Sequence, residues 1–414
     1  MKYIKIKNCR LCYSKKLRMV IDFGDIMLST IFPYKTTAYN KITPMILGVC
    51  KSCKAYQLLH NYNLNELYNK DYGYRSGINE SMKAHLKGIT NDIKKIIRFK
   101  KNDYVLDIAS NDATLLKSYN VSKINYVGID PTISKYKSYY PKQFKKKAKL
   151  FSKKEFFMLS QKNKAKVITS IAMFYDVQKP NKFVSDIKEI LTNDGVWVME
   201  MYYIPILLKL NAYDSICHEH ITYFSFTQIN KICKKYNLRV FKVSLNSMNC
   251  GSIRFFVCHD KSNFKTDHKS INRCKNYDNI LNNDKGFLNF KKRIKILSKK
   301  LKLTINKLKK NKKIIHVYGA STKGNVLMQY SKINANDIDF AADRNPLKWN
   351  RKMPGTNIPI ISEKTSRLKN PDYYLVLPWH FKTQFEKREK KFLKQGGKLI
   401  FPLPNIQIVS KKNN

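Results

Sequence analysis

Short apolar runs and amphipathic stretches alternate between residues 101 and 260. Apolar runs of the length of a buried strand recur four times, at 104–108, 126–129, 166–170 and 196–201. Helical patterns occur three times, at 114–119, 181–191 and 227–236. Two more strand patterns, 239–245 and 252–259, have no helix between them and indicate a hairpin at the end of the sheet. The alternation predicts a doubly wound α/β domain whose mostly parallel, seven-stranded sheet ends in an antiparallel strand.

A second βα pattern occupies residues 313–410, with strand patterns at 314–318, 338–342, 373–377 and 398–402. It predicts a second Rossmann-like domain. Apolar residues before it recur at steps of three and four, at Phe287, Phe290, Ile294, Leu297, Leu301, Ile305 and Leu308. This is the pattern of an amphipathic helix over 284–313. We expect the helix to dock between domains with its lysine-rich face in solvent, in preference to lying on a membrane surface.

Two CxxC pairs, Cys9-Arg-Leu-Cys12 and Cys50-Lys-Ser-Cys53, lie in a mostly strand-like segment. Each pair puts two thiolates on one side of a tight turn, and four thiolates close a tetrahedral shell without an open position. The spacing predicts a structural zinc site at these four cysteines. The alternative is a lost or redox-active site.

The length of 414 residues exceeds what one compact core usually holds. We therefore expect an α/β protein of three domains. Residues 1–65 would form a small zinc-binding domain, and residues 66–265 the first Rossmann-like domain. Residues 266–414 would contain the linker helix and the second Rossmann-like domain.

The formal net charge of +51 suggests nucleic acid as a partner. However, the excess is mostly lysine, spread along the chain, and arginine, which recognises bases and phosphates bidentately, is scarce. We expect no specific nucleic-acid function, only loose, salt-sensitive binding to polyanions.

No export signal or membrane span is expected. Residues 1–7 are basic, but no apolar segment follows them. The longest apolar run, 196–210, is interrupted by Glu200 and Pro205 and is too short for a bilayer. A cytoplasmic location follows, where thiols stay reduced, so the nine cysteines would bind metal or be buried.

The stretch from 103 to 131 has the layout of a nucleoside-binding βαβ unit. Its first strand pattern ends at Asp107, the small turn 109–113 follows, and the second strand pattern closes on Asp130. The turn lets a ligand approach the backbone, and the second acid can accept from ribose hydroxyls. The alternative is a parallel strand pair that binds nothing.

Two loops add further candidates. Residues 71–79, Asp-Tyr-Gly-Tyr-Arg-Ser-Gly-Ile-Asn, form either a surface loop or a hydroxyl-rich lid over the nucleoside site. Residues 319–325 form a glycine-flanked turn with Ser321, Thr322 and Lys323 at a predicted helix start. Free amides, helix dipole and ammonium together favour an anion there.

The stretch 213–225 contains His218 and His220 on either side of Glu219, past the carboxyl end of the 196–201 strand. Ligands of open α/β sheets gather there. An imidazole suits a general base, and Glu219 could orient it or raise its pKa. Two histidines at i and i+2 of an extended segment share a face, so metal binding is a second interpretation, and purely structural histidines a third.

Eight sequence blocks, in order along the chain, resemble the three-domain C-methyltransferases that act on nucleotide-linked 4-keto-deoxysugars; the two cysteine knuckles are the first block, and DRNPLKWNRKMPGTNIPI with LPWHF is the last. Beside the two cysteine knuckles, CRLC and CKSC, these blocks are YGYRSGINESMKAH, VLDIASNDATLL with VGIDP, SIAMFYDV, DSICHEHITYFS, GSIRFFV, VYGASTKGN, and DRNPLKWNRKMPGTNIPI with LPWHF. The resemblance covers nearly the whole chain. It implies a class I Rossmann-like methyltransferase domain, S-adenosylmethionine and zinc as cofactors, and a nucleotide sugar as substrate. The oligomeric state stays open.

The resemblance also implies roles for residues. His220 would remove the proton α to the ketone, with Glu219 as its partner or as a contact of the enolate, Tyr74 aiming its hydroxyl at the sugar, and His218 nearby. The cofactor would be bound by Asp107, Ala109, Asn111, Asp112, Asp130 and Asp176. The sugar nucleotide and its diphosphate would be bound by Arg75, Ser76, Arg254, Gly319, Ser321, Lys323 and Asn325.

This chain departs from the family pattern at five positions. Ala109 and Ala113 replace glycines of the turn. We expect alanine to fit only if its φ stays negative, and its methyl group to crowd the cofactor. The other departures are Cys217 where some members have tyrosine, Asp176 where some have histidine, and Cys250 where glycine is common.

Two other functions remain open from sequence. The first is O- or N-methylation of a sugar nucleotide with the same cofactor. The second is a non-catalytic, zinc-bearing scaffold that binds nucleotide sugars or polyanions, for which the intact HEH stretch would have no purpose.

Overall fold

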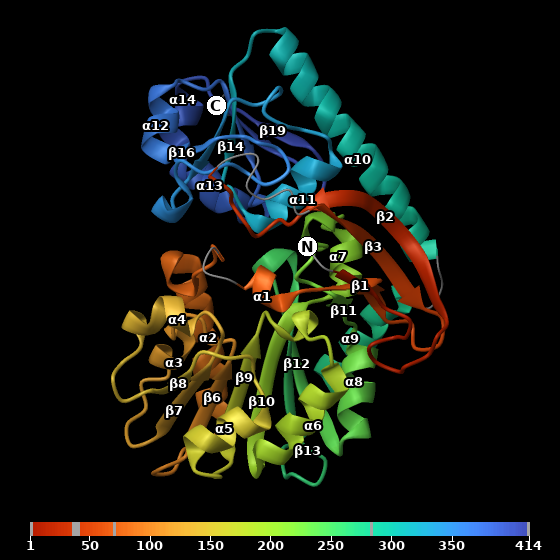
Figure 1. The fold of residues 1–414 in the computed structure, drawn as a ribbon, viewed down its shortest axis with the longest axis vertical. Helices are drawn as coiled ribbons and strands as arrows, with labels where there is room; N and C mark the ends of the chain where they lie inside the picture. The colour runs from red at the N-terminus through yellow and green to blue at the C-terminus, as the bar shows by residue number, and fades with distance from the viewer. Residues whose placement is uncertain (1–2, 35–41, 69–71, 282–284, 412–414) are drawn as a thin grey trace.

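The computed structural model describes residues 3–34, 42–68, 72–281 and 285–411 (Figure 1). In Figure 1 the two Rossmann-like domains lie one above the other, and the N-terminal strands lie at their side. The long helix α10 (Lys285–Lys310) runs along the same side.

The central domain is built on a seven-stranded sheet of order β12-β13-β10-β9-β6-β7-β8. All neighbouring pairs are parallel except those of β13, which is antiparallel to both β10 and β12. The strands are β6 (Tyr104–Ile108), β7 (Asn125–Ile129), β8 (Lys145–Lys147), β9 (Ala165–Ile171), β10 (Leu191–Tyr202), β12 (Leu238–Asn246) and β13 (Ser252–His259). This confirms the predicted Rossmann-like methyltransferase topology. The three lysines of β8 gave no strand signal.

Helices cover both faces of this sheet. They are α2 (Glu80–Ile96), α3 (Thr114–Ser118), α4 (Ile133–Tyr136), α5 (Lys153–Ser160), α6 (Pro180–Ile190), α8 (Phe226–Lys235) and α9 (His268–Asp278). Helix α7 (Ile204–Lys209) instead packs into the core that the three regions share. Local chemistry sets several of their ends. Helix α6 begins at Pro180, where the missing N–H costs nothing, and α8 has a capping box between Ser225 and Gln228.

The C-terminal domain has a six-stranded sheet of order β16-β15-β14-β17-β18-β19, parallel except for the last strand. Its strands are β14 (Ile315–Tyr318), β15 (Phe340–Asp343), β16 (Ile360–Ser362), β17 (Tyr373–Val376), β18 (Lys398–Phe401) and β19 (Gln407–Val409). Its helices are α11 (Thr322–Tyr330), α12 (Glu363–Leu368), α13 (Lys382–Arg388) and α14 (Lys390–Lys394). The second predicted Rossmann-like domain is confirmed.

The N-terminal region contains β1 (Tyr3–Lys5), β2 (Leu17–Met27), β3 (Ile42–Cys50), β4 (Tyr56–Leu58), β5 (His60–Tyr62) and the short helix α1 (Leu64–Leu67). Strands β2, β3 and β4 form a sheet that gains a fourth strand, β11 (Thr222–Tyr223), from the central domain. The stretch 213–225 is therefore fixed between two domains.

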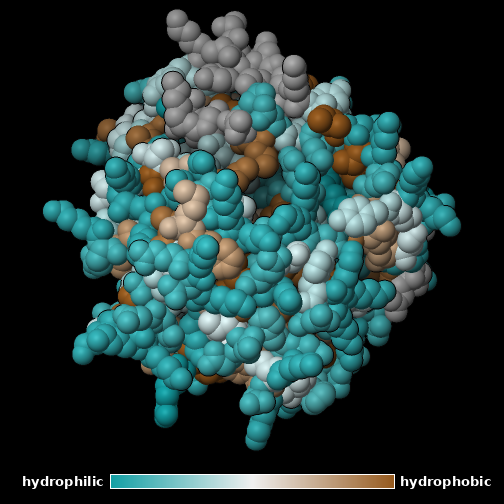
Figure 2. Space-filling model, turned by 60° about the horizontal axis from the view of Figure 1, so that its bottom comes forward, coloured by the Kyte–Doolittle hydropathy of each residue, from teal (hydrophilic) through white to brown (hydrophobic). Residues whose placement is uncertain are grey.

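Apolar residues of all three regions share one core. Helix α10 contributes to it, and the ring of Phe287 stacks on Tyr56 with centroids 3.6 Å apart. The expectation that this helix docks between domains is confirmed. Among the described residues, no helix combines the length and apolarity needed to cross a bilayer. Hydrophilic side chains dominate the face seen in Figure 2.

Candidate active site

A cavity of about 770 Å³ lies where the carboxyl ends of the two Rossmann-like sheets meet. The central sheet contributes Asp107 near the end of β6, Asp130 after β7 and Tyr202 at the end of β10. The C-terminal sheet contributes Gly319 after β14 and Asp343 at the end of β15. Because ligands of open α/β sheets bind at these ends, one cavity can hold ligands of both domains side by side.

Two buried carboxyl groups mark the end of the cavity nearest β6 and β7. Asp107 accepts a hydrogen bond from the Thr169 hydroxyl (2.6 Å), and Asp130 accepts from the backbone N–H of Asn111 (2.9 Å) and Thr132 (2.6 Å). Burial raises the pKa of Asp107 to about 7 and also raises the pKa of Asp130. The placement matches the predicted cofactor acids.

The turn between β6 and α3 has a glycine-type backbone without glycine. Ala109, Asn111 and Ala113 have φ values of 61°, 48° and 61°. The expectation that alanine would keep φ negative here is wrong. The backbone N–H of Ala109 donates to Ile129 O and that of Asn111 to the Asp130 carboxylate, and these bonds hold the turn against a strain of roughly 1–2 kcal/mol per residue. The methyl group of Ala113 is fully buried in the core, whereas Ala109 lines the cavity.

The side chains of Asn111 and Asp112 bind the neighbouring loop. The Asn111 Oδ1 accepts from Ser76 N (2.9 Å), and Asp112 Oδ2 accepts from Gly77 N (3.0 Å). Asn111 still lines the cavity, but Asp112 does not, so its predicted contact with the cofactor finds no support. A Cβ on Gly77 would lie 2.6 Å from Asp112 Oδ2, which is why glycine is needed there.

The loop after residue 71 forms a wall of the cavity, as the lid interpretation requires. Tyr72, Tyr74, Arg75 and Ser76 all line it. The Arg75 guanidinium lies 4.4 Å from the ring centroid of Tyr139. Asp71, the first residue of the predicted segment, lies outside the described residues.

The HEH stretch is a tight turn, closed by a hydrogen bond from His220 N to Cys217 O (3.0 Å). His218 and His220 therefore do not share a face, and the extended geometry assumed from sequence is wrong. His218 is fully buried against the N-terminal domain, edge-on to the Tyr62 ring at 4.9 Å, and does not line the cavity. Its position fits a structural role, and a metal site of two histidines is not formed.

His220 faces the cavity between the rings of Tyr175 and Tyr202, at centroid distances of 4.4 and 5.0 Å. Its Nδ1 lies 2.8 Å from the carbonyl oxygen of Ser215. Since a carbonyl only accepts, Nδ1 carries the proton and Nε2 keeps a free lone pair. Burial, with a smaller effect of the Lys323 charge, lowers the pKa of His220 to about 3, so the imidazole is neutral.

The same burial shifts the pKa of Glu219 in the opposite direction. Burial raises the pKa of its carboxyl group to about 8, with Cys217 Sγ 3.6 Å from its Oε2. Asp176 also lines the cavity, accepts from the Tyr68 hydroxyl (2.9 Å), and has a pKa raised well above its usual value by burial and by the charge of Glu219. At neutral pH Glu219 is thus mostly a neutral acid next to a neutral base. Such a divergent pair is typical of acid–base sites.

Possible ligand atoms of Cys217, Glu219 and His220 lie within 4.8 Å of one another. Cys217 and Glu219 contact each other, and His220 has its Nδ1 on Ser215 O and its Nε2 free toward the cavity. We therefore interpret the group as one for proton transfer.

Two predicted substrate ligands do not reach the cavity. Arg254 is buried and donates to Glu200 (2.8 Å) and Asp92 (2.9 Å), so its guanidinium is used within the central domain. Asn325 is fully buried and donates to Ser29 O (2.6 Å), which ties α11 to the N-terminal domain. The structure therefore does not support Arg254 and Asn325 as ligands of the sugar nucleotide.

The predicted anion-binding turn does line the cavity, through Gly319, Ser321 and Lys323. Ser321 caps α11 by accepting from Gly324 N (3.1 Å). Gly319 has φ +84°, and a Cβ there would lie 2.7 Å from Pro378, so both conformation and space require glycine. The Lys323 side chain turns toward the central domain, with Nζ 4.5 Å from the Tyr202 ring centroid.

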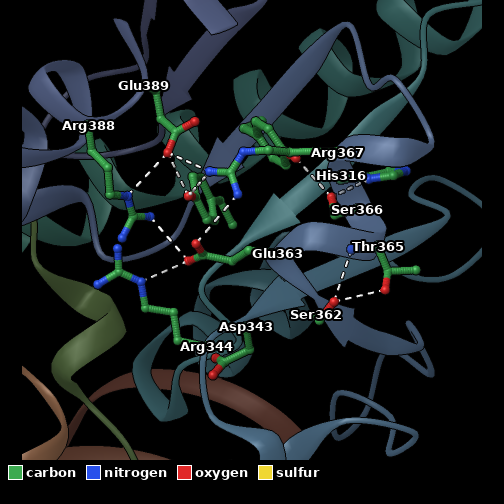
Figure 3. A network of polar contacts seen from close by, with 12 residues as sticks. His316, Asp343, Arg344, Ser362, Glu363, Thr365, Ser366, Arg367, Arg388 and Glu389 are labelled. Atoms are coloured by element: carbon green, nitrogen blue, oxygen red, sulfur yellow. Dashed lines mark hydrogen bonds and ion pairs between the residues drawn. The ribbon is translucent and has the colours of Figure 1, made fainter. Parts of the chain in front are cut away.

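Sequence reasoning missed an arginine cluster at the C-terminal end of the cavity. Arg344 and Arg388 converge on Glu363, each at 3.2 Å, and all three line the cavity (Figure 3). His380 lines it as well, with a pKa far below its usual range because of burial. A signal was present, since Asp343 ends β15 much as Asp130 directly follows β7, but no spacing pointed to the arginines.

The four cysteines of the N-terminal domain are placed for zinc. The Sγ atoms of Cys9 and Cys53 lie 3.6 Å apart, those of Cys12 and Cys50 3.5 Å apart, and all four lie within 4.8 Å. Tetrahedral thiolates about 2.3 Å from a zinc ion would be about 3.8 Å apart. The residues fit the metal, and the site is remote from the cavity lining.

The residues at the end of the cavity nearest β6 and β7 likewise fit their expected ligand, S-adenosylmethionine. Asp107 and Asp130 offer two acceptors beside a turn whose backbone lines the cavity at Ala109. Fold and site together define a methyltransferase of the S-adenosylmethionine-dependent class, with a structural zinc site.

Three family descriptions match successive segments: a zinc binding domain at residues 9–68, a methyltransferase domain at 79–243, and a C-methyltransferase C-terminal domain at 247–404. Together the three matches describe an S-adenosylmethionine-dependent methyltransferase with a C-methyltransferase C-terminal domain. The chain is 23% identical to the C-methyltransferase NovU of Streptomyces niveus over 99% of this chain and 98% of that protein. The non-catalytic scaffold interpretation is thereby excluded.

Solved methyltransferases match only part of the chain. An S-adenosylmethionine-dependent methyltransferase from Clostridium acetobutylicum is 12% identical, covers 44% of this chain and 93% of its own, and has a TM-score of 0.33. An O-methyltransferase family protein from Burkholderia thailandensis is 11% identical, with 44% and 59% coverage and the same TM-score.

Proposed function

We propose that the protein methylates a sugar carbon next to the ketone of a nucleotide-linked 4-keto-deoxysugar. The observation that carries the proposal is the pairing of a neutral imidazole, His220, with the protonated acid Glu219 in a cavity shared by two nucleotide-binding-type folds. Removing a proton next to a ketone requires a base for the carbon and a hydrogen-bond donor for the oxygen. This pair supplies both.

The reaction can be followed through the protein's groups. His220 Nε2 accepts the α-proton while its Nδ1–H stays on Ser215 O, which fixes the ring. Glu219 donates to the ketone oxygen as the C–H electron pair moves into the enolate. S-adenosylmethionine supplies an electrophilic methyl group. The walls formed by Tyr72 and Tyr74 keep bulk water away from the carbon.

The substrate class is supported by the second sheet. A sugar without a nucleotide would need only the central domain. Here the Gly319 turn, Arg344 and Arg388 (Figure 3) extend the cavity into the C-terminal domain. Backbone amides at a helix start and arginines both suit phosphates. Arg75 and Ser76 from the loop close the same space. A nucleoside diphosphate attached to the sugar accounts for the groups that the C-terminal domain and the loop contribute to the cavity.

The direct test is incubation of a panel of nucleotide-linked 4-keto sugars with S-adenosylmethionine and isotopically labelled methyl, followed by mass spectrometry. We expect one added methyl group on one or a few members, resistant to acid and base as a C-methyl is. Methyl transfer to oxygen or nitrogen, or none to any 4-keto sugar, would refute the proposal.

Replacement Glu219→Gln is expected to alter the pH profile. Glu219 with a pKa near 8 donates only while protonated, so wild-type turnover should be level at pH 6–7 and fall above pH 8. Glutamine keeps a neutral N–H donor, so the variant should retain part of the turnover and lose the alkaline limb. The measurement is kcat against pH at saturating cofactor. An unchanged alkaline limb would contradict the donor role, and Glu219→Ala serves as the donor-free control.

Replacement Asp107→Asn is expected to flatten the pH dependence of cofactor affinity. If Asp107 accepts from the ligand's ammonium group, only its carboxylate binds well, and a pKa raised to about 7 places ionisation between pH 6 and 7.5. Wild-type affinity for S-adenosylhomocysteine should rise several-fold over that range, below the pKa of about 8 of an α-amino group. Calorimetry at several pH values tests this. An equal rise in the variant would assign the titration elsewhere.

A further inference from the structure

One ammonium group in the cavity has no partner. Lys323 lies in the first turn of α11, and its Nζ is shielded from solvent without any hydrogen-bond acceptor in the described part of the chain. Its contact is the Tyr202 ring, at 4.5 Å from the centroid. A buried ammonium without an acceptor is unfavourable by several kcal/mol, so its position is explained if a ligand brings the acceptor.

This ammonium group lies at the end of the cavity that contains Tyr202 and His220. Tyr202 contacts both groups: Lys323 Nζ lies 4.5 Å from its ring centroid, and the His220 ring centroid lies 5.0 Å from it. The positive charge of Lys323 acts on His220 and on the buried carboxyl group of Asp214. Asp214 is itself engaged, because it accepts from the indole N–H of Trp379 (2.9 Å).

The diphosphate has other candidates farther along the cavity. Arg344 and Arg388 project from the C-terminal domain around Glu363, and Ser321 and the Gly319 backbone form the turn itself. Lys323 is the residue of that turn whose side chain reaches the rim of the central sheet, since its Nζ touches Tyr202 of β10. Its sequence position suggested a phosphate ligand, but its side chain direction does not.

We propose that Lys323 stabilises the enolate, with its ammonium group donating a hydrogen bond to the substrate's ketone oxygen. The inference rests on the proposed function and deepens it. His220 Nε2 takes the α-proton, the C–H pair becomes the carbon–carbon double bond, and the carbonyl pair moves onto oxygen between Lys323 and Glu219. When the carbon attacks the methyl group, the carbonyl re-forms and Lys323 keeps all its protons. Preorganised donors of this kind contribute about 10²–10³-fold each.

The test separates enolisation from nucleotide binding. Wild type and the variants Lys323→Met and Lys323→Arg are incubated in D₂O with S-adenosylhomocysteine and the 4-keto sugar nucleotide that the panel identifies. Deuterium incorporation next to the ketone is followed by NMR. Affinities for UDP and dTDP alone are measured by calorimetry, and affinity for S-adenosylhomocysteine reports that each variant is folded.

We expect Lys323→Met to slow exchange at saturating substrate by about 10²-fold or more. The arginine variant should recover part of that loss, because it keeps the charge and the donors. The affinity of both variants for a nucleoside diphosphate should stay within threefold of wild type. If Lys323→Met exchanges as fast as wild type but binds a nucleoside diphosphate more than tenfold more weakly, Lys323 is a phosphate ligand. That result would overturn the inference. Wild-type protein that neither exchanges nor methylates any 4-keto sugar would overturn the proposed function, and this inference with it.

Discussion

His220→Ala is expected to lower kcat by about 10²–10⁴-fold, the usual contribution of a positioned general base. His220 Nε2 is the free ring nitrogen facing the cavity, whereas His218, the other imidazole beside Glu219, does not line it. Cofactor affinity should change little, because Asp107 and Asp130 lie at the other strand ends. Single-turnover methyl transfer and calorimetry with S-adenosylhomocysteine measure the two effects.

His218→Phe is the matched control for this experiment. The residue belongs to the same tight turn, has a similar size, and faces Tyr62 away from the cavity. We expect its melting temperature to fall while kcat stays within several-fold of wild type. Equal losses of turnover in both variants, or full activity of His220→Ala, would show that the turn acts only as a scaffold.

Cys50→Ser is expected to lower the melting temperature by roughly 10 °C or more and to abolish stoichiometric zinc. Cys50 is fully buried and ends β3, which pairs with β4, and β4 in turn pairs with β11 of the central domain. Loss of the metal therefore loosens the sheet that fixes the 213–225 stretch. Calorimetric melting and metal analysis provide the measurement.

Cys274→Ser serves as the matched control, because Cys274 is a buried thiol in α9 outside the four-cysteine cluster. We expect one zinc per chain in wild type and in this control. Protein that keeps one zinc per chain after Cys50→Ser would contradict the four-cysteine site. A second zinc in wild type, lost with Cys217→Ser, would instead assign metal to the Cys217, Glu219 and His220 group.

The local sequence pattern was sufficient to predict those elements whose formation depends on neighbouring residues. The strand 104–108 and the strand 252–259 have the predicted bounds, because apolar runs of that length are stable only in a buried sheet. The CxxC pairs likewise prescribe a four-thiolate cluster, since each brings two ligands together by itself. Strand β8, a run of three lysines, was not predicted, because its pairing with β7 comes from the backbone and not from apolar side chains.

The candidate site shows the limit of that reasoning. His218 and His220 differ by two positions, yet one faces the N-terminal domain and the other the cavity, because a turn reverses the chain between them. Arg254 has the charge of a phosphate ligand, but two carboxyl groups from β10 and α2 occupy it. Neither fact is encoded within a window of neighbouring residues.

The amino-acid sequence alone determined the three-domain order, the zinc ligands, the paired Rossmann-like sheets and the stretch that holds the candidate histidine His220, because periodicity and ligand spacing are local properties. Only the tertiary structure decided that the two sheets direct their carboxyl ends into one cavity, and that Lys323 of one domain reaches Tyr202 of the other. It also set the pKa values of His220 and Glu219 apart, since burial depends on segments distant in the chain.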